Sequence, residues 1–317
     1  MKTIKSLLII AGLMLITTTV YAQDYPSKPV ELIIPFTAGS ATDFVGRTVA
    51  QKLSEMWGQP VEVENVGGAG GTIGADLVAK APADGYTLLE HSSAYAVSPA
   101  LYKNLPYNPA KDFIAISSLA SQPLALVVGT SSNLTSVTEV ISQAKSQPGE
   151  MKFASPGIGS ASHLSAEQFN IAAGINVAHE PYKGGPETIS AIKNGTATFA
   201  FLPLALAFKE GLKALAVTSS ERSSALPDVP TIAETGPAGF ESRVWWGIWA
   251  PAGIPDSIAN KLETDIAQAL AAPEVIEQFK SKKLDPMIMT SEEFKQFVPR
   301  EIEAVKNIVE QAGIEAQ

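Results

Sequence analysis

Two short turns rich in Gly, Ser and Ala are the parts of this 317-residue chain best suited to hold a ligand. Each follows an apolar, strand-like run and precedes a helix-like run. The turns consist of Phe36, Thr37, Ala38, Gly39, Ser40, Ala41, Thr42 and Asp43, and of Ser155, Pro156, Gly157, Ile158, Gly159, Ser160, Ala161, Ser162 and His163. The first N–H groups of a helix are unpaired and carry partial positive charge, so small residues there let a carboxylate or phosphate approach the main chain. Two such turns, far apart in the sequence, predict two lobes that each offer a helix end to one acidic ligand.

The charge balance favours main-chain recognition of that ligand. The chain has 23 Lys and Arg against 32 Asp and Glu, a net charge of −9. An acidic chain is a poor partner for nucleic acid. The arginines are only four in number: Arg47, Arg222, Arg243 and Arg300. We therefore expect backbone amides, rather than an arginine clamp, to carry most of the recognition of an anion.

The N-terminus has the pattern of a secretory signal peptide. Lys2 and Lys5 precede an unbroken apolar stretch, Leu7 to Ile16, and small residues flank Tyr21 at a cleavage-like site. The stretch is shorter than the ~20 residues that a membrane-spanning helix needs. We predict that residues 1–22 are a signal peptide and are removed on export.

The chain contains no cysteine. This excludes disulfides, thiolate metal sites, a thiol nucleophile and the lipidated cysteine that tethers bacterial surface lipoproteins. An exported protein without a tether needs an enclosed compartment to be useful. We therefore predict a periplasmic protein that is not lipid-anchored.

Strand-like and helix-like segments alternate along the chain. Strands are predicted at Val30–Ile34, Val61–Glu64 and Tyr86–Leu89, and a second alternating series starts with Leu124–Val128. Such alternation predicts an α/β fold of helix-covered, mostly parallel sheets. About 295 residues remain without the leader, and roughly 150 residues per domain predicts two domains.

The order of the elements also predicts how the domains divide. The first lobe is expected to be discontinuous, comprising residues 23–123 and 244–317, and the second to comprise residues 124–243. Two strands would then cross between the lobes, the second being the very apolar run Val244–Trp249. Paired crossings make a hinge, and the cleft beside a hinge is a natural ligand site.

A set of ordered motifs resembles one known family. The motifs are Pro26-Ser27-Lys28-Pro29-Val30, Pro35 to Asp43, Glu64-Asn65, Gly68-Ala69-Gly70-Gly71, Asp84-Gly85-Tyr86-Thr87-Leu88, Pro99-Ala100-Leu101-Tyr102, Gly159 to Leu164, Pro181-Tyr182-Lys183-Gly184-Gly185, Ala214 to Ser219, Leu226 to Thr231 and Ala250-Pro251-Ala252-Gly253. Over nearly all of the mature chain, the sequence resembles the substrate-binding proteins of the tripartite tricarboxylate transporter family, the Bordetella uptake gene-like group.

The resemblance implies a two-lobed periplasmic binding protein of the type II-like class. Such a receptor closes on a small carboxylate and delivers it to the integral-membrane permease subunits of a secondary transporter. It implies no cofactor and no metal, and we expect a monomer. By the family pattern one jaw would comprise Phe36, Thr37, Ala38, Gly39, Ser40 and Asp43, and the other Ser155, Gly157, Gly159, Ser160 and His163.

Two departures from the family pattern bear on the ligand. The family usually has a Gly-Gly pair in the first turn, whereas here Gly39 is followed by Ser40. Where the family often reads Phe-Asp-Ser-Leu-Pro, this chain has Ala200 and Phe201 in place of Asp and Ser. If these two side chains face the cleft, the far end of the ligand meets an apolar surface, which favours an aromatic or aliphatic mono- or dicarboxylate.

Several candidate residues also have ordinary structural explanations. Asp43 and Thr42 are typical helix N-cap residues, and we expect Asp43 to bridge or support the turn rather than to contact an anion. His163 lies in the first turn of its helix, where positive charge is unfavourable, so we expect a neutral ring that donates one hydrogen bond.

Other candidates are weaker. Ser93 and Tyr95 follow a strand end and are candidates for the pocket, and Lys183 lies either at its rim or on an exposed loop. The tryptophans of the late strand are expected in the core, with a cleft wall as the alternative. They are Trp245, Trp246 and Trp249.

The sequence favours a receptor over an enzyme. It has neither H-E-x-x-H nor G-x-S-x-G nor a P-loop. The glycine loop after Val66 lacks dinucleotide spacing and is better explained by turns that need glycine. Two alternatives stay open: a ligand-sensing partner of a membrane signalling protein, and an exported hydrolase in which Ser160 and His163 would have to meet.

Overall fold

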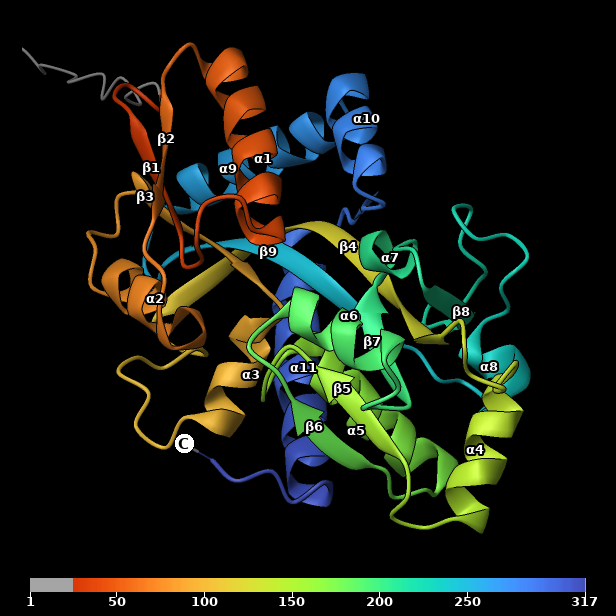
Figure 1. The fold of residues 1–317 in the computed structure, drawn as a ribbon. Helices are drawn as coiled ribbons and strands as arrows, with labels where there is room; N and C mark the ends of the chain where they lie inside the picture. The colour runs from red at the N-terminus through yellow and green to blue at the C-terminus, as the bar shows by residue number, and fades with distance from the viewer. Residues whose placement is uncertain (1–24, 317) are drawn as a thin grey trace, which may run out of the picture.

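The computed structural model describes residues 25–316, which form one mixed α/β arrangement of ten strands around which the helices pack (Figure 1). The strands are β1 (Val30–Ile34), β2 (Val61–Asn65), β3 (Thr87–Ser92), β4 (Phe113–Gly129), β5 (Lys152–Ser155), β6 (Ala178–Pro181), β7 (Phe199–Pro203), β8 (Leu212–Val217), β9 (Arg243–Pro251) and β10 (Asp285–Pro286). The helices are α1 (Ala41–Trp57), α2 (Thr72–Ala79), α3 (Ala94–Leu101), α4 (Val137–Ser146), α5 (Ala161–Ala173), α6 (Gly185–Lys193), α7 (Leu204–Ala207), α8 (Ile232–Thr235), α9 (Asp256–Leu270), α10 (Pro273–Ser281) and α11 (Ser291–Gln311), with a 3-10 turn at Ala69–Gly71. The predicted leader lies outside the described residues.

Strand β4 connects two groups of strands. Its first part pairs with β9 as far as Pro123, in the group ordered β2-β1-β3-β9-β4. From Leu124 it pairs with β7 on one side, and from Ala125 with β8 on the other, in the group ordered β8-β4-β7-β5-β6. The predicted lobe boundary at residues 123 and 124 stays a prediction, and this exchange of partners supports it.

The sheets are mixed rather than mostly parallel. β1 pairs in parallel with β2 and β3, and β5 with β6 and β7. Every antiparallel pair involves β4 or β9. Helical crossovers produce the parallel pairs. β4 runs from the first group of strands into the second, and β9 returns beside it, so these two strands lie antiparallel to each other. The α/β class is confirmed, and the expected pairing is corrected at β4 and β9.

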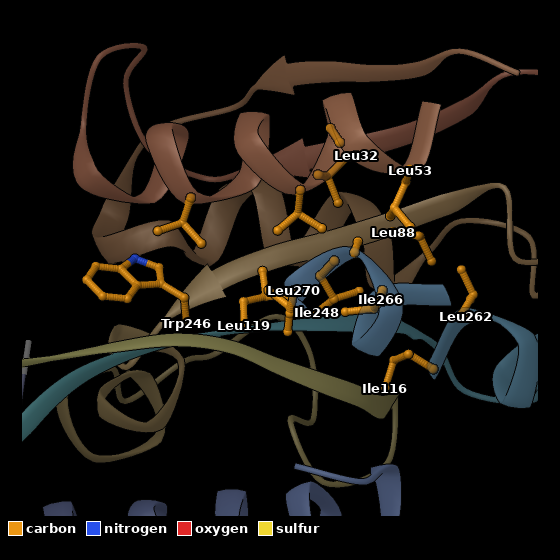
Figure 2. Close-up of a cluster of buried hydrophobic side chains, with 14 of the residues drawn as sticks. Leu32, Leu53, Leu88, Ile116, Leu119, Trp246, Ile248, Leu262, Ile266 and Leu270 are labelled. Atoms are coloured by element: carbon orange, nitrogen blue, oxygen red, sulfur yellow. The ribbon is translucent and has the colours of Figure 1, made fainter. Parts of the chain in front are cut away.

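The apolar cores follow the two groups of strands. The largest cluster lies between the first group and helices α1 and α9, and Figure 2 shows its close packing. Its drawn members include Leu32 of β1, Leu53 of α1, Leu88 of β3 and Leu262 of α9. A separate cluster, built around Phe153, Phe169 and Phe199, fills the second group. Each group of strands thus has an apolar core of its own.

Helix α11 lies between the two groups. It packs against α3 and α5, as Figure 1 shows at the lower centre of the molecule. Thr290 and Glu293 fix its start through a reciprocal capping box. Within residues 25–316 no helix combines the length and the apolar character needed to cross a membrane.

Candidate functional site

The first turn is built by hydrogen bonds among three of its own residues. Gly39 has φ +81°, a backbone conformation that glycine adopts most easily. Ser40 is the N-cap of α1, and its hydroxyl accepts from the Asp43 N–H at 3.1 Å. Asp43 Oδ2 in turn accepts from the Gly39 N–H at 2.8 Å. The cap is therefore Ser40, not Thr42 or Asp43.

The second turn repeats this design with a different side chain. Gly159 has φ +76°, and Ser160 is the N-cap of α5, accepting from the His163 N–H at 3.2 Å. Here the acceptor for the Gly159 N–H is His163 Nδ1, at 3.1 Å. Because Nδ1 accepts, a neutral ring carries its proton on Nε2. The predicted neutral state agrees with this geometry, but Nδ1 bonds to the turn and is not available to a ligand.

These internal bonds change which amides are available to a ligand. The N–H groups of Gly39, Asp43, Gly159 and His163 are occupied by the protein's own side chains. Within residues 25–316, the first two N–H groups of α1 and of α5 have no hydrogen-bond partner. They belong to Ala41 and Thr42 in α1 and to Ala161 and Ser162 in α5. At the two helix starts, the donors that could hold an anion therefore lie one to two residues beyond the serine caps.

Asp43 is tied to Arg47 of α1 and Asn65 of β2 rather than directed at an anion. Its Oδ1 accepts from Arg47 Nε at 2.8 Å and from Asn65 Nδ2 at 2.8 Å. Burial by itself raises the pKa of Asp43, but the hydrogen bonds from Gly39 and Asn65 and the Arg47 charge outweigh it and lower the pKa. The carboxylate is a structural support for the turn, as expected.

His163 rests on a second histidine. Its ring stacks on His179 with centroids 3.9 Å apart, and His179 stacks on Phe153. Burial, and then the proximity of His163, lower the pKa of His179 to about 4. His179 Nε2 bonds to the Ser155 hydroxyl at 2.7 Å. The second turn thus rests on neutral imidazoles, whereas the first rests on an ion pair.

Two further titratable side chains lie on β3. Glu90 is fully buried, and burial, followed by the nearby Asp43 carboxylate, raises its pKa well above the ordinary value. Burial lowers the pKa of the neighbouring His91 to about 4, although hydrogen bonding to Ser92 and Gly71 opposes the shift. Gly71 has φ +96°, and a Cβ there would collide with His91. The positive φ agrees with the turn that the sequence indicated, and close packing against His91 is a second reason for glycine at this position.

A cavity of about 610 Å³ reaches both turns. Ala41 and Thr42 line it from α1, and Ala161 lines it from α5. Trp246 of β9 also lines it, and its Nε1 donates to Thr42 Oγ1 at 3.1 Å. Three of the four unpaired amides therefore belong to residues that face one shared space.

The cavity contains some of the predicted site residues but not others. Phe36, Ser93, Gly159 and Ser160 line it. The remaining candidates do not line it: Thr37, Ala38, Gly39, Ser40, Asp43, Tyr95, Ser155, Gly157, His163, Lys183, Ala200 and Phe201. Gly39, Ser40 and Asp43 instead border a neighbouring hollow beside α7 and α10.

Three of these exclusions have clear packing reasons. Tyr95 is buried, stacks on Trp249 at 4.4 Å and donates its hydroxyl to the Pro109 carbonyl. Ser155 is fully buried beneath the second turn. Lys183 is exposed on the loop before α6.

The expected apolar cleft surface at Ala200 and Phe201 is wrong. Both side chains have zero exposure, because β7 is covered on both faces. Phe201 packs with Phe169 and Phe240, and Ala200 belongs to the cluster on the opposite face. The strand reaches the cavity only through Pro203 at its end.

The residues missed from the sequence come from segments far from the two turns. Gln122 and Arg243 line the cavity where β4 and β9 meet, and Gln168 lines it from α5. Helix α11 contributes one face, with residues at positions i, i+4, i+7, i+8 and i+11: Phe297, Glu301, Ala304, Val305 and Ile308. Helical spacing alone places such residues on one face of a helix, and it does not distinguish a cavity wall from a face buried in the core.

The sequence profile of the tripartite tricarboxylate transporter family receptor matches residues 45–314. The chain belongs to this family. The resemblance inferred from the motifs is confirmed, and the chain is a member of a receptor family of a membrane transporter.

Individual relatives cover nearly the whole receptor. The chain is 37% identical over 304 residues to Protein BugT of Bordetella pertussis, covering 94% of this chain and 93% of that protein. An R. palustris protein solved with adipate has a TM-score of 0.80 at 32% identity, covering 93% of this chain and 100% of that one. MatC of Rhodopseudomonas palustris, solved with malate, has a TM-score of 0.75 at 29% identity, covering 90% and 100%.

Proposed function

We propose that this receptor captures a small carboxylate in the 610 Å³ cavity, between two lobes that close on it, and delivers it to permease subunits in the membrane. The observation that carries the proposal is the set of unpaired N–H groups at Ala41, Thr42 and Ala161, from two helix starts on one cavity. Helix N-termini bind anions through such groups and through the helix dipole. Family membership, and the adipate and malate bound to two similar proteins, support the carboxylate class.

The proposal includes export to the periplasm through a cleaved leader. The basic and apolar pattern of residues 1–22 supports this step, as does the similarity to a protein described as the periplasmic binding protein BugD. A receptor without an anchor would diffuse between the captured ligand and its permease.

We further propose that the protein is not an enzyme. The hydrolase alternative needs a ring nitrogen of His163 to activate the Ser160 hydroxyl. Instead, that hydroxyl accepts from the His163 main chain, and Nδ1 accepts from Gly159. The hydrogen bond between Ser155 and His179 joins buried groups beneath the turn and does not line the cavity. This arrangement supports binding rather than nucleophilic attack.

Proline at the first position of each helix tests the amide site directly. Proline lacks the N–H but suits this position, and the extended Ser40 (ψ 166°) and Ser160 (ψ 154°) suit a following proline. A panel including hexanoate, adipate, malate and benzoate is first screened by thermal shift. The best binder is then titrated by calorimetry against Ala41→Pro and Ala161→Pro, with Ala41→Gly and Ala161→Gly as controls that keep the N–H.

We expect each proline variant to stay folded and to lose affinity roughly 10- to 100-fold, as expected for one hydrogen bond to a charged group. The glycine variants should bind nearly as the wild type does. Wild-type affinity in both proline variants would overturn the amide site, and the absence of any binder in the panel would contradict carboxylate capture.

A further inference from the structure

The cavity has one charged end, separate from the two turns. Its lining includes three ionic side chains, Glu241, Arg243 and Glu301. Arg243 forms an ion pair with Glu241, so its charge is already matched. Two carboxylates thus face one guanidinium, so the ionic side chains of the lining are negative by one charge, although the Arg243 and Arg300 charges also act on Glu301.

Glu301 is held in place on the α11 side of β9. Its Oε2 accepts from Trp245 Nε1 at 2.9 Å. The next residue, Trp246, donates to Thr42 of the first turn. Consecutive side chains on a strand point to opposite faces, so Glu301 and the first turn lie on opposite sides of β9.

The distance from the charged end of the cavity to the second turn can be judged along α5. The helix lines the cavity from its cap Ser160 to Gln168, eight residues that rise about 12 Å in total at 1.5 Å per residue. Gln168 donates to the carbonyl of Glu241, beside Arg243. The Glu241–Arg243 pair therefore lies well along α5 from the second turn, and Glu301, on which the Arg243 charge acts, belongs to that end of the cavity.

The space between the two ends is largely apolar. Val97, Leu164, Val244, Met287, Met289 and Phe297 line it. An aliphatic chain suits these side chains, and the ring of Phe297 adds an aromatic surface of the kind that attracts cations.

We propose that the ligand is a carboxylate with a positively charged amino group at the far end of an aliphatic chain, and that Glu301 selects this amino group. The proposal rests on the proposed function, because the amides at the turns must hold the carboxylate. A second carboxylate would meet the negative lining instead. The same lining would give an uncharged end no ionic partner and would leave the half-buried Glu301 carboxylate beside an apolar group. Burial raises the pKa of Glu301, although the Trp245 hydrogen bond and the Arg243 charge oppose the shift, and a bound cation would stabilise the ionised form.

Ligands of equal length that differ only at the far end test this selection. Hexanoate, 6-aminohexanoate and adipate are titrated by calorimetry, and the eight-carbon series octanoate, 8-aminooctanoate and suberate is run beside them. In one length or the other, we expect the amino acid to bind at least tenfold more tightly than the diacid, with the plain acid between them. Equal or tighter binding of the diacid in both series would overturn the selection by Glu301.

Glu301→Gln identifies the residue. The amide oxygen can still accept from Trp245, so the fold should persist, while the preference for the amino acid over the plain acid should fall to within about threefold. Glu303→Gln is the matched control, because Glu303 is exposed on the same helix and outside the cavity. An unchanged preference in Glu301→Gln would contradict the assignment.

The two proposals fail in different ways. If the plain acid or the diacid binds but the amino acid does not, carboxylate capture stands and the role of Glu301 falls. If none of the six compounds binds, and the wider carboxylate panel also gives no binder, the proposed function itself is contradicted.

Discussion

The two turns have the same backbone design but different supports. Gly-Ser-Ala-Thr-Asp in the first and Gly-Ser-Ala-Ser-His in the second both place a serine cap after a glycine of positive φ. The fifth residue accepts from the glycine N–H in each, through Asp43 Oδ2 or His163 Nδ1. The requirement is thus for an acceptor at this position, and its chemistry decides how each turn responds to acid and to mutation.

The surroundings of the two turns differ as well. A Cβ on Gly39 would meet no atom within 4 Å, whereas one on Gly159 would collide with Leu101 of α3. The second turn is therefore pressed against the opposite half of the molecule, close to an apolar cluster of Val97, Leu101, Leu164 and Val309. Its conformation is coupled to the approach of α3, whereas that of the first turn is not.

The largest difference in stability between the two turns is expected when Gly39 and Gly159 are each replaced by valine. Gly159→Val combines left-handed strain with overlap against Leu101 and should lower the free energy of unfolding by about 3 to 5 kcal/mol. Gly39→Val has only the strain and should cost about 1 to 3 kcal/mol. Urea denaturation of both variants measures the difference, and equal losses would show that the contact with α3 does not matter.

Removal of the acceptor should cost more in the first turn. Asp43→Ala leaves Gly39, Arg47 and Asn65 without a charged acceptor and should lower the free energy of unfolding by about 2 to 3 kcal/mol. His163→Phe keeps the stacked ring and removes the acceptor for Gly159 alone, at about 1 to 2 kcal/mol. A larger loss in His163→Phe, by urea denaturation, would reverse this ranking.

Acid should weaken the support of the second turn first. The unfolded chain protonates His179 below its ordinary pKa of 6.5, but the folded chain does so only near pH 4, so stability falls as the pH drops through this window. His179→Gln should reduce that fall by up to about 2 kcal/mol, while His91 contributes to the background in both proteins. The lowered pKa of Asp43 gives stability that is complete above its ordinary 3.8 and is lost only below it. Identical pH profiles for the variant and wild type would contradict the role of His179.

Loss of the serine caps should have the smallest effect on the free energy of unfolding, and this effect should be equal in the two turns. Ser40→Ala and Ser160→Ala each remove one cap hydrogen bond and should each cost about 1 kcal/mol of unfolding free energy. Thermal or urea unfolding can measure both. A loss in one turn alone would show that the two caps are not equivalent.

Much of the fold was predictable because its signals are local. The strand at Val30–Ile34 was predicted with its exact bounds, and the helix-like run expected after the second turn is α5. The fully buried tryptophans Trp245, Trp246 and Trp249 were also expected. These features depend on side-chain periodicity and on caps within four residues, which the sequence states directly.

Other elements had no local signal. β4 begins at Phe113, eleven residues before the predicted strand at Leu124, because its polar middle, Ser117 to Gln122, does not look like a strand. Irregular pairing with β9 accommodates this stretch. Residues Ala94–Leu101 and Pro273–Ser281 form helices that were not predicted. Contacts with distant segments stabilise these regions, and no window of sequence contains those contacts.

The sequence by itself determined the two turns, the α/β class and the family, because each follows from neighbouring residues or from an ordered set of motifs. Tertiary structure decided that Ala200 and Phe201 lie in the core and that Glu301 of the last long helix faces the cavity. The physical reason is that hydrogen bonds within a turn span a few residues, whereas the lining of a cavity depends on how elements far apart in the chain pack together.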